Sequence, residues 1–392
     1  MAKNCRIFAA LAAATLASAG IAARAAAQPG GVTLPPSGGN QRQSIAQGIG
    51  LVRVSIDYSS PHVHSPSGVD RRGKIWGKDE HGKDNLIPYG LTNLGFGTCG
   101  DQCPWRGGAN ENTVFTTTHD IRVQGQPLPA GSYGLHFIAD PQEWTVIFSK
   151  NYTSWGSFFY DAKEDALRVK AKPAKSEYHE DLTYEFRDRK LDHATAVLRW
   201  EDLELPIAIT VPNSTDLYVE NMARELRSTA GFTWQGWSAA VQYCLQNKTH
   251  PDLALQWAKK AVDPSSGQEN FDTLAVLAEA EDANGHAEEA KQDRERAIHH
   301  ATATPFGLHT YGRQLIGMKK TAEAMQVFEA NAKLHPETWP VHVGLARGHA
   351  ALGHRKEAIA EARLGLPQAP NEASRKNLEQ LIDQLEQGKE IN

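Results

Sequence analysis

A glycine-rich loop in the first half of the chain carries side chains that could bind or transform a ligand. The loop runs from Trp105 to Glu111 and includes Arg106 and Asn110. A guanidinium can hold an anion or sugar hydroxyls, and a carboxylate can act as a base or a ligand. Rigid sheets often hold binding residues on such loops, so Arg106, Asn110 and Glu111 are ligand-binding candidates. In the alternative, Asn110 and Glu111 satisfy backbone groups of a turn and Arg106 pairs with Glu111.

Histidines in the same half suggest a metal site. His62 and His64 form an H-x-H pattern, which in a strand places both rings on one face. His136 alternates with large apolar residues, so we expect it to leave the core face as a further ligand-binding candidate. With Glu111, these rings could hold copper or zinc if the fold brings them together. The loop-like run after His64 favours solvated histidines instead.

Two cysteines lie close together in a glycine-containing loop. Cys99 and Cys103 are separated by three residues, a spacing at which loop cysteines can approach closely enough to form a disulfide. A pair of free thiols is the second interpretation. Zinc is the third, because no second C-x-x-C motif supplies the remaining ligands.

Motifs of several enzyme classes are absent. The chain contains no G-x-S-x-G, H-E-x-x-H or G-x-x-x-x-G-K-[ST] motif. Its formal net charge is -5 at pH 7, so there is no basic surplus of the kind that nucleic-acid binders use. These observations favour a non-catalytic protein that does not bind nucleic acid.

The elements that would position these side chains change character near residue 213. From Leu51 to Val211, apolar and polar residues alternate with the period of half-buried strands. About eight short runs separated by turn residues predict an all-β sandwich or barrel over residues 48–212. The clearest runs are 52–58, 133–137, 144–148, 167–171, 182–186, 196–200 and 205–211. Residues 28–47 are expected to form a flexible leader.

The second half is predicted to be entirely helical, with a linker helix over 213–233 and repeats over 234–388. Two interleaved series of small residues recur every 34 residues: Ala290, Ala324 and Ala358, and Ala278, Gly312 and Ala346. Leu277, Tyr311 and Leu345 keep the same step. This pattern resembles the tetratricopeptide repeat, a 34-residue helical hairpin. The expected fold is therefore multidomain, a β-domain followed by an all-α tetratricopeptide-like array that ends in a capping helix.

The resemblance to tetratricopeptide repeats implies a groove for a protein or peptide partner, lined by the first helix of each hairpin. The matching positions include Asp272, Glu279, His309, Arg313 and Arg347. Arg313 and Arg347 are one period apart, so they should project side by side and could hold a carboxylate. In the alternative they are solvated arginines paired with Glu279 or Asp282.

Several stretches of the first half resemble a family of exported bacterial proteins known as domain of unknown function 2911. They include Ser55–Pro61, Gly73–Gly77, Ile87–Gly90, Trp105–Glu111, Leu128–Tyr133 and Glu143–Phe148. The resemblance extends over residues 44–211. It implies a compact β-domain in an exported protein and no assigned activity.

The first 27 residues have the pattern of a secretory signal peptide. Lys3 and Arg6 precede an apolar run, and an Ala-x-Ala site ends at Ala27. We expect cleavage there, a periplasmic or secreted protein, and no stable membrane span afterwards. The alternative is an uncleaved anchor. The leading hypothesis is thus an exported, non-catalytic binding scaffold, and its rival is an enzyme or metalloprotein with the site in the β-domain.

Overall fold

The computed structural model describes residues 39–389, which form two compact units. The expected signal peptide at residues 1–27 lies outside the described residues. The first unit ends at Thr210 and contains ten strands, whereas the second begins at Val211 and contains ten α-helices. Within residues 39–389, no helix combines the length and apolar character that crossing a bilayer requires.

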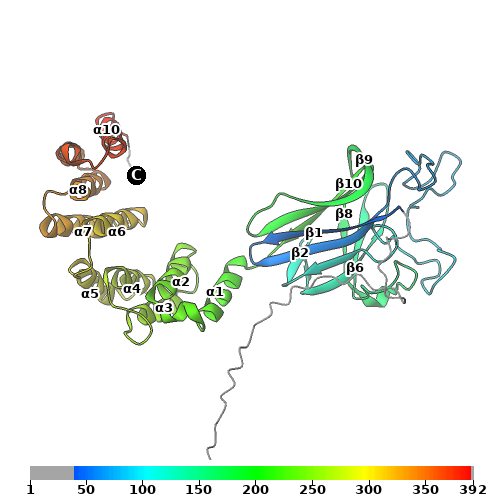
Figure 1. Ribbon diagram of the computed structural model, residues 1–392, viewed down its shortest axis with the longest axis horizontal. Coiled ribbons are helices and arrows are strands. Elements are labelled where there is room, and N and C mark those ends of the chain that lie inside the picture. Colours follow the sequence, from blue (N-terminus) through cyan, green and yellow to red (C-terminus); the bar gives the residue numbers. More distant parts are fainter. Residues whose placement is uncertain (1–38, 390–392) are drawn as a thin grey trace, which may run out of the picture. The chain divides into compact units, whose positions relative to one another are not determined.

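Two antiparallel sheets form the first unit (Figure 1). One has the strand order β1-β2-β3-β6-β7-β8 and the other β5-β4-β10-β9. The strands are β1 (Gln41–Ile49), β2 (Val52–Ser60), β3 (Val114–Thr117), β4 (Ile121–Val123), β5 (Gln126–Leu128), β6 (Gly131–Ile138), β7 (Trp144–Ser149), β8 (Asp165–Ala171), β9 (Ala174–Arg187) and β10 (His193–Thr210).

The two sheets share one core, which is why apolar side chains alternate along their strands. Trp144 of β7 and Trp200 of β10 are both at most 1% exposed. Both rings lie within 6.2 Å of Trp105, and Trp76 contacts all three. Trp76 and Trp105 are thus part of this core cluster. The predicted sandwich is confirmed.

The flexible leader expected over residues 28–47 is wrong for its last part. Residues from Gln41 onward form β1, which pairs antiparallel with β2 along its whole length. Most β1 side chains are exposed. The strand is therefore held by backbone hydrogen bonds at a sheet edge, and its polar sequence carries no alternation that would predict it.

Two runs that were predicted as separate strands are one strand. Residues 196–200 and 205–211 both fall largely in β10, which pairs with β9 through register shifts around Glu201. Glu201 has a left-handed backbone (φ 57°) and is buried, and its carboxylate accepts the backbone N–H of Gly73. The interruption in the alternation thus marks an irregularity within one strand and not its end.

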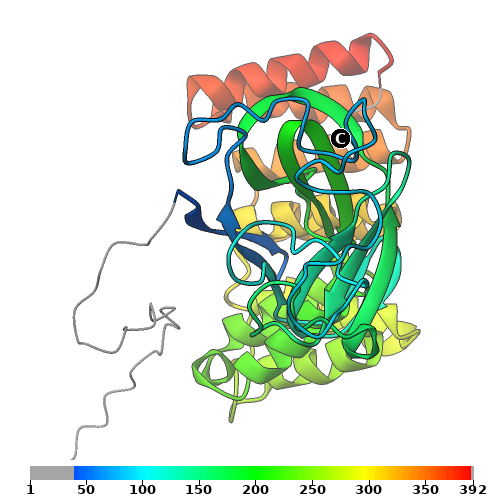
Figure 2. The same ribbon diagram turned by 90° about the vertical axis from the view of Figure 1, so that its right-hand side faces the viewer.

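The second unit is a series of helical hairpins. Its helices are α1 (Ser214–Glu225), α2 (Trp234–Gln246), α3 (Pro251–Val262), α4 (Phe271–Ala283), α5 (Ala287–Ile298), α6 (Pro305–Gly317), α7 (Thr321–Leu334), α8 (Trp339–Ala351), α9 (Arg355–Gly365) and α10 (Glu372–Glu386). From α2 to α9 they pack in pairs and follow one another in chain order, from green to red in Figures 1 and 2.

The helical hairpins repeat every 34 residues, as the sequence predicted. Helices α4, α6 and α8 begin at residues 271, 305 and 339, and α5, α7 and α9 begin at 287, 321 and 355. Ala290, Ala324 and Ala358 are each the fourth residue of their helix and are fully buried. Gly312 occupies the small-residue position of α6, where an added Cβ would lie 2.3 Å from the Phe328 ring. The small residues therefore let paired helices approach closely, as the repeat pattern predicted.

Candidate functional site

The glycine-rich loop of the β-domain is anchored mainly through its own backbone. Arg106 donates to the carbonyl of Asn110, and its guanidinium lies 4.9 Å from the Phe158 ring centroid. The hydroxyl of Tyr184 donates to the carbonyl of Gly107 at 2.7 Å. Burial lowers the pKa of Arg106. The Arg106 side chain therefore stabilises the loop from its buried side.

The predicted pairing of Arg106 with Glu111 is wrong. Glu111 accepts from the Ser59 hydroxyl at 3.2 Å and lies 3.6 Å from the guanidinium of Arg42. Asn110 has a left-handed backbone (φ 58°), and its side-chain oxygen accepts from Asn40. Asn110 thus supports the turn, whereas Glu111 keeps a half-exposed carboxylate at the end of the loop.

His136 points away from the core face, as expected, but it does not reach solvent. It is 2% exposed, and its Nδ1 lies 3.0 Å from the hydroxyl of Ser157. The reason is tertiary: a loop containing Ser157 and Tyr160 covers the outer face of β6, so both faces of this strand are buried. Burial, with a contribution from Arg106, lowers the pKa of His136 to about 3.

A serine–histidine hydrogen bond is the pairing that nucleophilic catalysis uses, but its surroundings do not suit that chemistry. Ser157 is fully buried and faces a cavity of only about 100 Å³, which Arg106 also lines. A histidine whose pKa is about 3 is a weak base at neutral pH. The arrangement fits a buried polar contact that fixes the loop on the sheet.

The histidines proposed as metal ligands do not converge. His62 pairs with Asp181 and with the carbonyl of Gly39, whereas His64 Nδ1 lies 2.9 Å from Glu180. His136 has different neighbours, so the three rings do not share a site. No group of three or more His, Cys, Asp or Glu side chains among residues 39–389 could hold a metal ion. The residues present therefore do not fit the copper or zinc site considered above.

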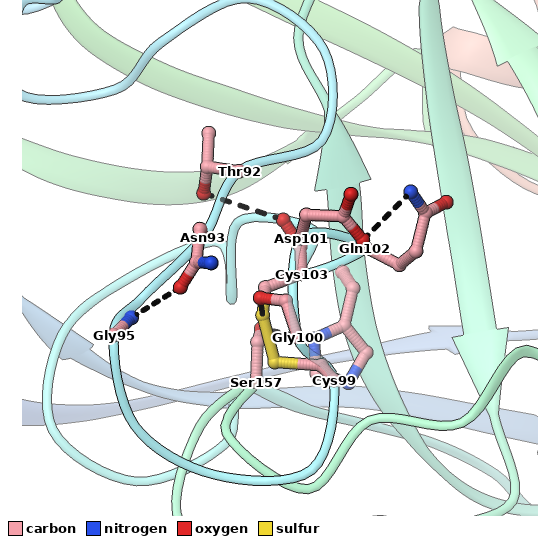
Figure 3. Close-up of a disulfide and its surroundings, with 10 residues drawn as sticks. Thr92, Asn93, Gly95, Cys99, Gly100, Asp101, Gln102, Cys103 and Ser157 are labelled. Atoms are coloured by element: carbon pink, nitrogen blue, oxygen red, sulfur yellow. Dashed lines mark hydrogen bonds between the residues drawn. A yellow bond between two sulfur atoms is a disulfide. The ribbon is translucent and has the colours of Figure 1, made fainter.

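Cys99 and Cys103 form a disulfide, the first of the three interpretations of this pair (Figure 3). Their Cα atoms are 5.2 Å apart. Both cysteines are buried with Ile147 and Tyr160. The bridge thus fastens an irregular loop over the sheet.

The helical unit contains a cavity lined by the first helices of three hairpins. It has a volume of about 310 Å³ and receives side chains from α2, α4 and α6, together with Met318. Asp272 and Glu279 supply its two carboxylates. The remaining lining side chains are neutral: Gln242, Leu245, Gln246, Phe271, Ala275, Val276, Thr310, Tyr311 and Gln314, with Gly307. We call this volume the acidic pocket.

A second cavity adjoins the first along α6 and reaches α8. It has a volume of about 570 Å³ and is lined by Arg313, Lys319 and Arg347, with the neutral residues Thr310, Gln314, Ile316 and Gly317. Thr310 and Gln314 line both cavities, so the two meet there. Burial, with the charge of Arg313 second, lowers the pKa of Arg347 to about 10. We call this second volume the basic pocket, and the two together the first-helix groove.

One predicted groove residue lies beneath the surface. His309 is 5% exposed, and its ring lies against the rings of Phe306 and Phe328 in tilted contacts. Burial, with the nearby charges of Arg347 and Arg313, lowers its pKa to about 4. His309 therefore forms part of the helix packing, because its position on α6 faces the neighbouring hairpin.

Several lining residues were not predicted from the sequence. Thr310, Gln314 and Gln242 are neutral, and their types alone suggest no chemistry. The repeat step offered a signal, because Thr310 lies one period after Val276, which also lines the groove. The same step relates Glu279 to Arg313 and Arg347, so equivalent positions carry opposite charges in the two pockets.

A known protein family matches the β-domain, and solved structures are similar to part of the chain. Residues 40–209 match the model of the family described as "Protein of unknown function (DUF2911)". This match agrees with the resemblance of the β-domain to that family. No curated protein matches the chain.

Solved structures similar to the chain include MamA and a tetratricopeptide repeat protein. A crystal structure of MamA protein shows 16% identity, covers 41% of this chain and 85% of that one, and has a TM-score of 0.28. A tetratricopeptide repeat protein from Parabacteroides merdae ATCC 43184 shows 15% identity, covers 43% of this chain and 68% of that one, and has a TM-score of 0.27. At such scores, the assignment of the helical hairpins rests on their own 34-residue register.

Proposed function

We propose that this protein is a non-catalytic scaffold that binds a segment of a partner polypeptide in the first-helix groove. The observation that carries the proposal is the position of the acidic and basic pockets, which are lined almost entirely by α2, α4, α6 and α8. These are the first helices of successive hairpins, the elements that line the binding surface in stacked helical repeats.

The groove has the chemistry to hold an extended peptide. Gln242, Gln246, Thr310 and Gln314 line it and can pair with the N–H and C=O groups of a bound backbone. The guanidinium groups of Arg313 and Arg347 can hold a carboxylate of the partner. Separate pockets of opposite charge would fix the direction of the peptide.

A peptide array tests this function. The purified protein is applied to immobilised ten-residue peptides of varied sequence, alongside a variant carrying Arg313→Gln and Arg347→Gln. We expect binding of a subset that contains acidic residues, and a loss of at least tenfold in affinity in the variant, about 1.4 kcal/mol.

A matched variant controls for the change in net charge. Lys356 and Arg375 are exposed cations of α9 and α10 that do not line the groove. The Lys356→Gln, Arg375→Gln variant should bind as the unmodified protein does. If no peptide binds, or if both variants bind equally well, the groove is not the binding surface.

We also propose that the protein is exported to the periplasm or beyond. The signal-peptide pattern of residues 1–27 supports this location, and disulfides such as Cys99–Cys103 persist in oxidising compartments. Amino-terminal sequencing of the protein recovered from the cell envelope should begin at Gln28. A protein found in the cytoplasm with Met1 intact would contradict export.

A further inference from the structure

Glu279 is a buried carboxylate that faces the acidic pocket. Its side chain is on α4, is 9% exposed, and lines the cavity together with Asp272 of the same helix. Within residues 39–389, Glu279 has no hydrogen-bonded or ion-paired partner. A carboxylate that is nine-tenths buried and lacks a partner is costly, and such a group in a cavity points to a ligand that would satisfy it.

The cations nearest to Glu279 are already engaged elsewhere. The ammonium of Lys320 lies 2.5 Å from Asp282, and the guanidinium of Arg294 pairs with the same carboxylate oxygen. Tyr311 of α6 lies against Arg294 and also faces Glu279. The side of Glu279 that faces the cavity is therefore left to a ligand.

The walls of the acidic pocket match a long basic side chain. Leu245, Phe271, Val276 and Met318 offer apolar surface along which an alkyl stem can pack. Asp272 is exposed at the same cavity, so a cation that reaches Glu279 also meets a second carboxylate. The neutral amides of Gln242 and Gln246 add hydrogen-bonding groups from α2.

We propose that the acidic pocket is a binding site for the cationic side chain of a lysine or arginine in the bound polypeptide, with Glu279 as its principal partner. This proposal deepens the proposed function and rests on it for the place of the peptide. Together, the two pockets would select a segment with a basic residue at one position and an acidic residue farther along.

Binding at this site depends on pH. Burial raises the pKa of Glu279 to about 7, while Lys320 and Arg294 oppose the shift and Asp282 adds to it. Only the ionised carboxylate attracts a cation, so apparent affinity follows the ionised fraction. Between pH 6 and pH 8 this fraction rises about tenfold for a pKa near 7, and affinity should rise by a similar factor.

The test uses a small probe, so that it does not require the partner. Met318 lines the acidic pocket, whereas Met222 of α1 does not. In the full-length protein labelled at its methionine methyl groups, Nα-acetyl-lysine methylamide is titrated at pH 8 and the methyl resonances are followed by NMR. We expect the Met318 resonance to shift with saturation and the Met222 resonance to stay in place.

Three controls isolate the role of the charge. Nα-acetyl-norleucine methylamide has the apolar stem without the ammonium and should bind at least fivefold more weakly. The Glu279→Gln variant should lose the preference for lysine, and the Glu288→Gln variant, changed at an exposed position of α5, should keep it. The lysine affinity should fall about tenfold at pH 6 in the unmodified protein and stay constant in Glu279→Gln.

Equal binding of the two probes, or an affinity independent of pH, would overturn the proposed cation site. If peptides bind on the array but the lysine probe does not shift the Met318 resonance, the cation site is overturned and the proposed function stands. Conversely, a lysine-specific shift without any array binding supports the site and removes the proposed function.

Discussion

At the scale of single residues, Gly312 shows how closely the hairpins are packed. A Cβ atom there would lie 2.3 Å from the buried ring of Phe328, which cannot move aside without disturbing the core around it. We predict that Gly312→Ala lowers the free energy of unfolding by about 1–3 kcal/mol, because the clash outweighs the better helix propensity of alanine. Urea denaturation followed by far-ultraviolet circular dichroism measures the difference.

The matched control for this substitution is on the same helix. Gly317 has nothing within 4 Å of its added Cβ, so Gly317→Ala should be neutral or stabilise by up to about 1 kcal/mol. If Gly312→Ala were as stable as Gly317→Ala, α6 would not approach the Phe328 ring as closely as the structure shows.

Glu279 makes stability depend on pH in a defined direction. Its pKa is raised from 4.5 to about 7, so the folded protein holds this proton more tightly than the unfolded chain does. Stability is therefore lost as pH rises through the window from 4.5 to 7 and the loss is complete above it. We predict that Glu279→Gln, which carries no charge, becomes more stable than the unmodified protein by about 3 kcal/mol at pH 8, and by little at pH 4.5.

Urea denaturation at pH 4.5, 6 and 8 measures this difference. The Glu288→Gln variant, changed at an exposed carboxylate, should show no such trend. An advantage of Glu279→Gln that is the same at every pH would mean that the carboxylate titrates normally in the folded protein.

At the scale of elements, the turns after the first helices use one backbone conformation. Gly285 and Gly353 have φ of 79° and 80°, and Lys319 occupies the equivalent position after α6 with φ 64°. Left-handed backbone is costly for a residue with a Cβ and easy for glycine. We predict that Lys319→Gly raises the free energy of unfolding by about 0.5–1 kcal/mol.

The reverse substitution provides the comparison. Gly353→Ala should destabilise by about 1 kcal/mol, since its added Cβ meets no atom within 4 Å and only the backbone conformation opposes it. Thermal melts of both variants measure the two effects. Shifts in the same direction would argue against a common turn.

At the scale of the whole molecule, the two units have separate cores and should unfold separately. The disulfide lies in the first unit, and the remaining described cysteine, Cys244, is a free thiol in the second. Calorimetry should show two transitions. Replacing Cys99 and Cys103 by serine should lower the transition temperature of the β-domain only. For so short a loop, we expect its free energy of unfolding to fall by about 2 kcal/mol.

The Gly312→Ala variant supplies the converse experiment, because it should lower only the transition of the helical unit. A single transition that both sets of substitutions shift together would show that the units unfold as one.

Periodic patterns were enough to predict the architecture. The alternation along β2, β6 and β7 indicated a sandwich, and the 34-residue step indicated hairpins, because each pattern directly records which side chains are buried. The sequence of edge strand β1 shows no such pattern, because backbone pairing with β2 holds the strand and most of its side chains are exposed.

Which side chains could act together was decided only by the tertiary structure. His136 has the sequence position of an outward-facing residue, but a loop from elsewhere in the chain covers it. In the sequence, Glu279 looks like an ordinary carboxylate of a helix. Only the packing of α2, α4 and α6 buries its side chain beside a cavity, where it has no partner among the described residues. The sequence by itself determined the two kinds of unit and the repeat step, because periodicity is local. Burial, charge partners and cavities depend on segments distant along the chain, and these decided which candidate residues form a site.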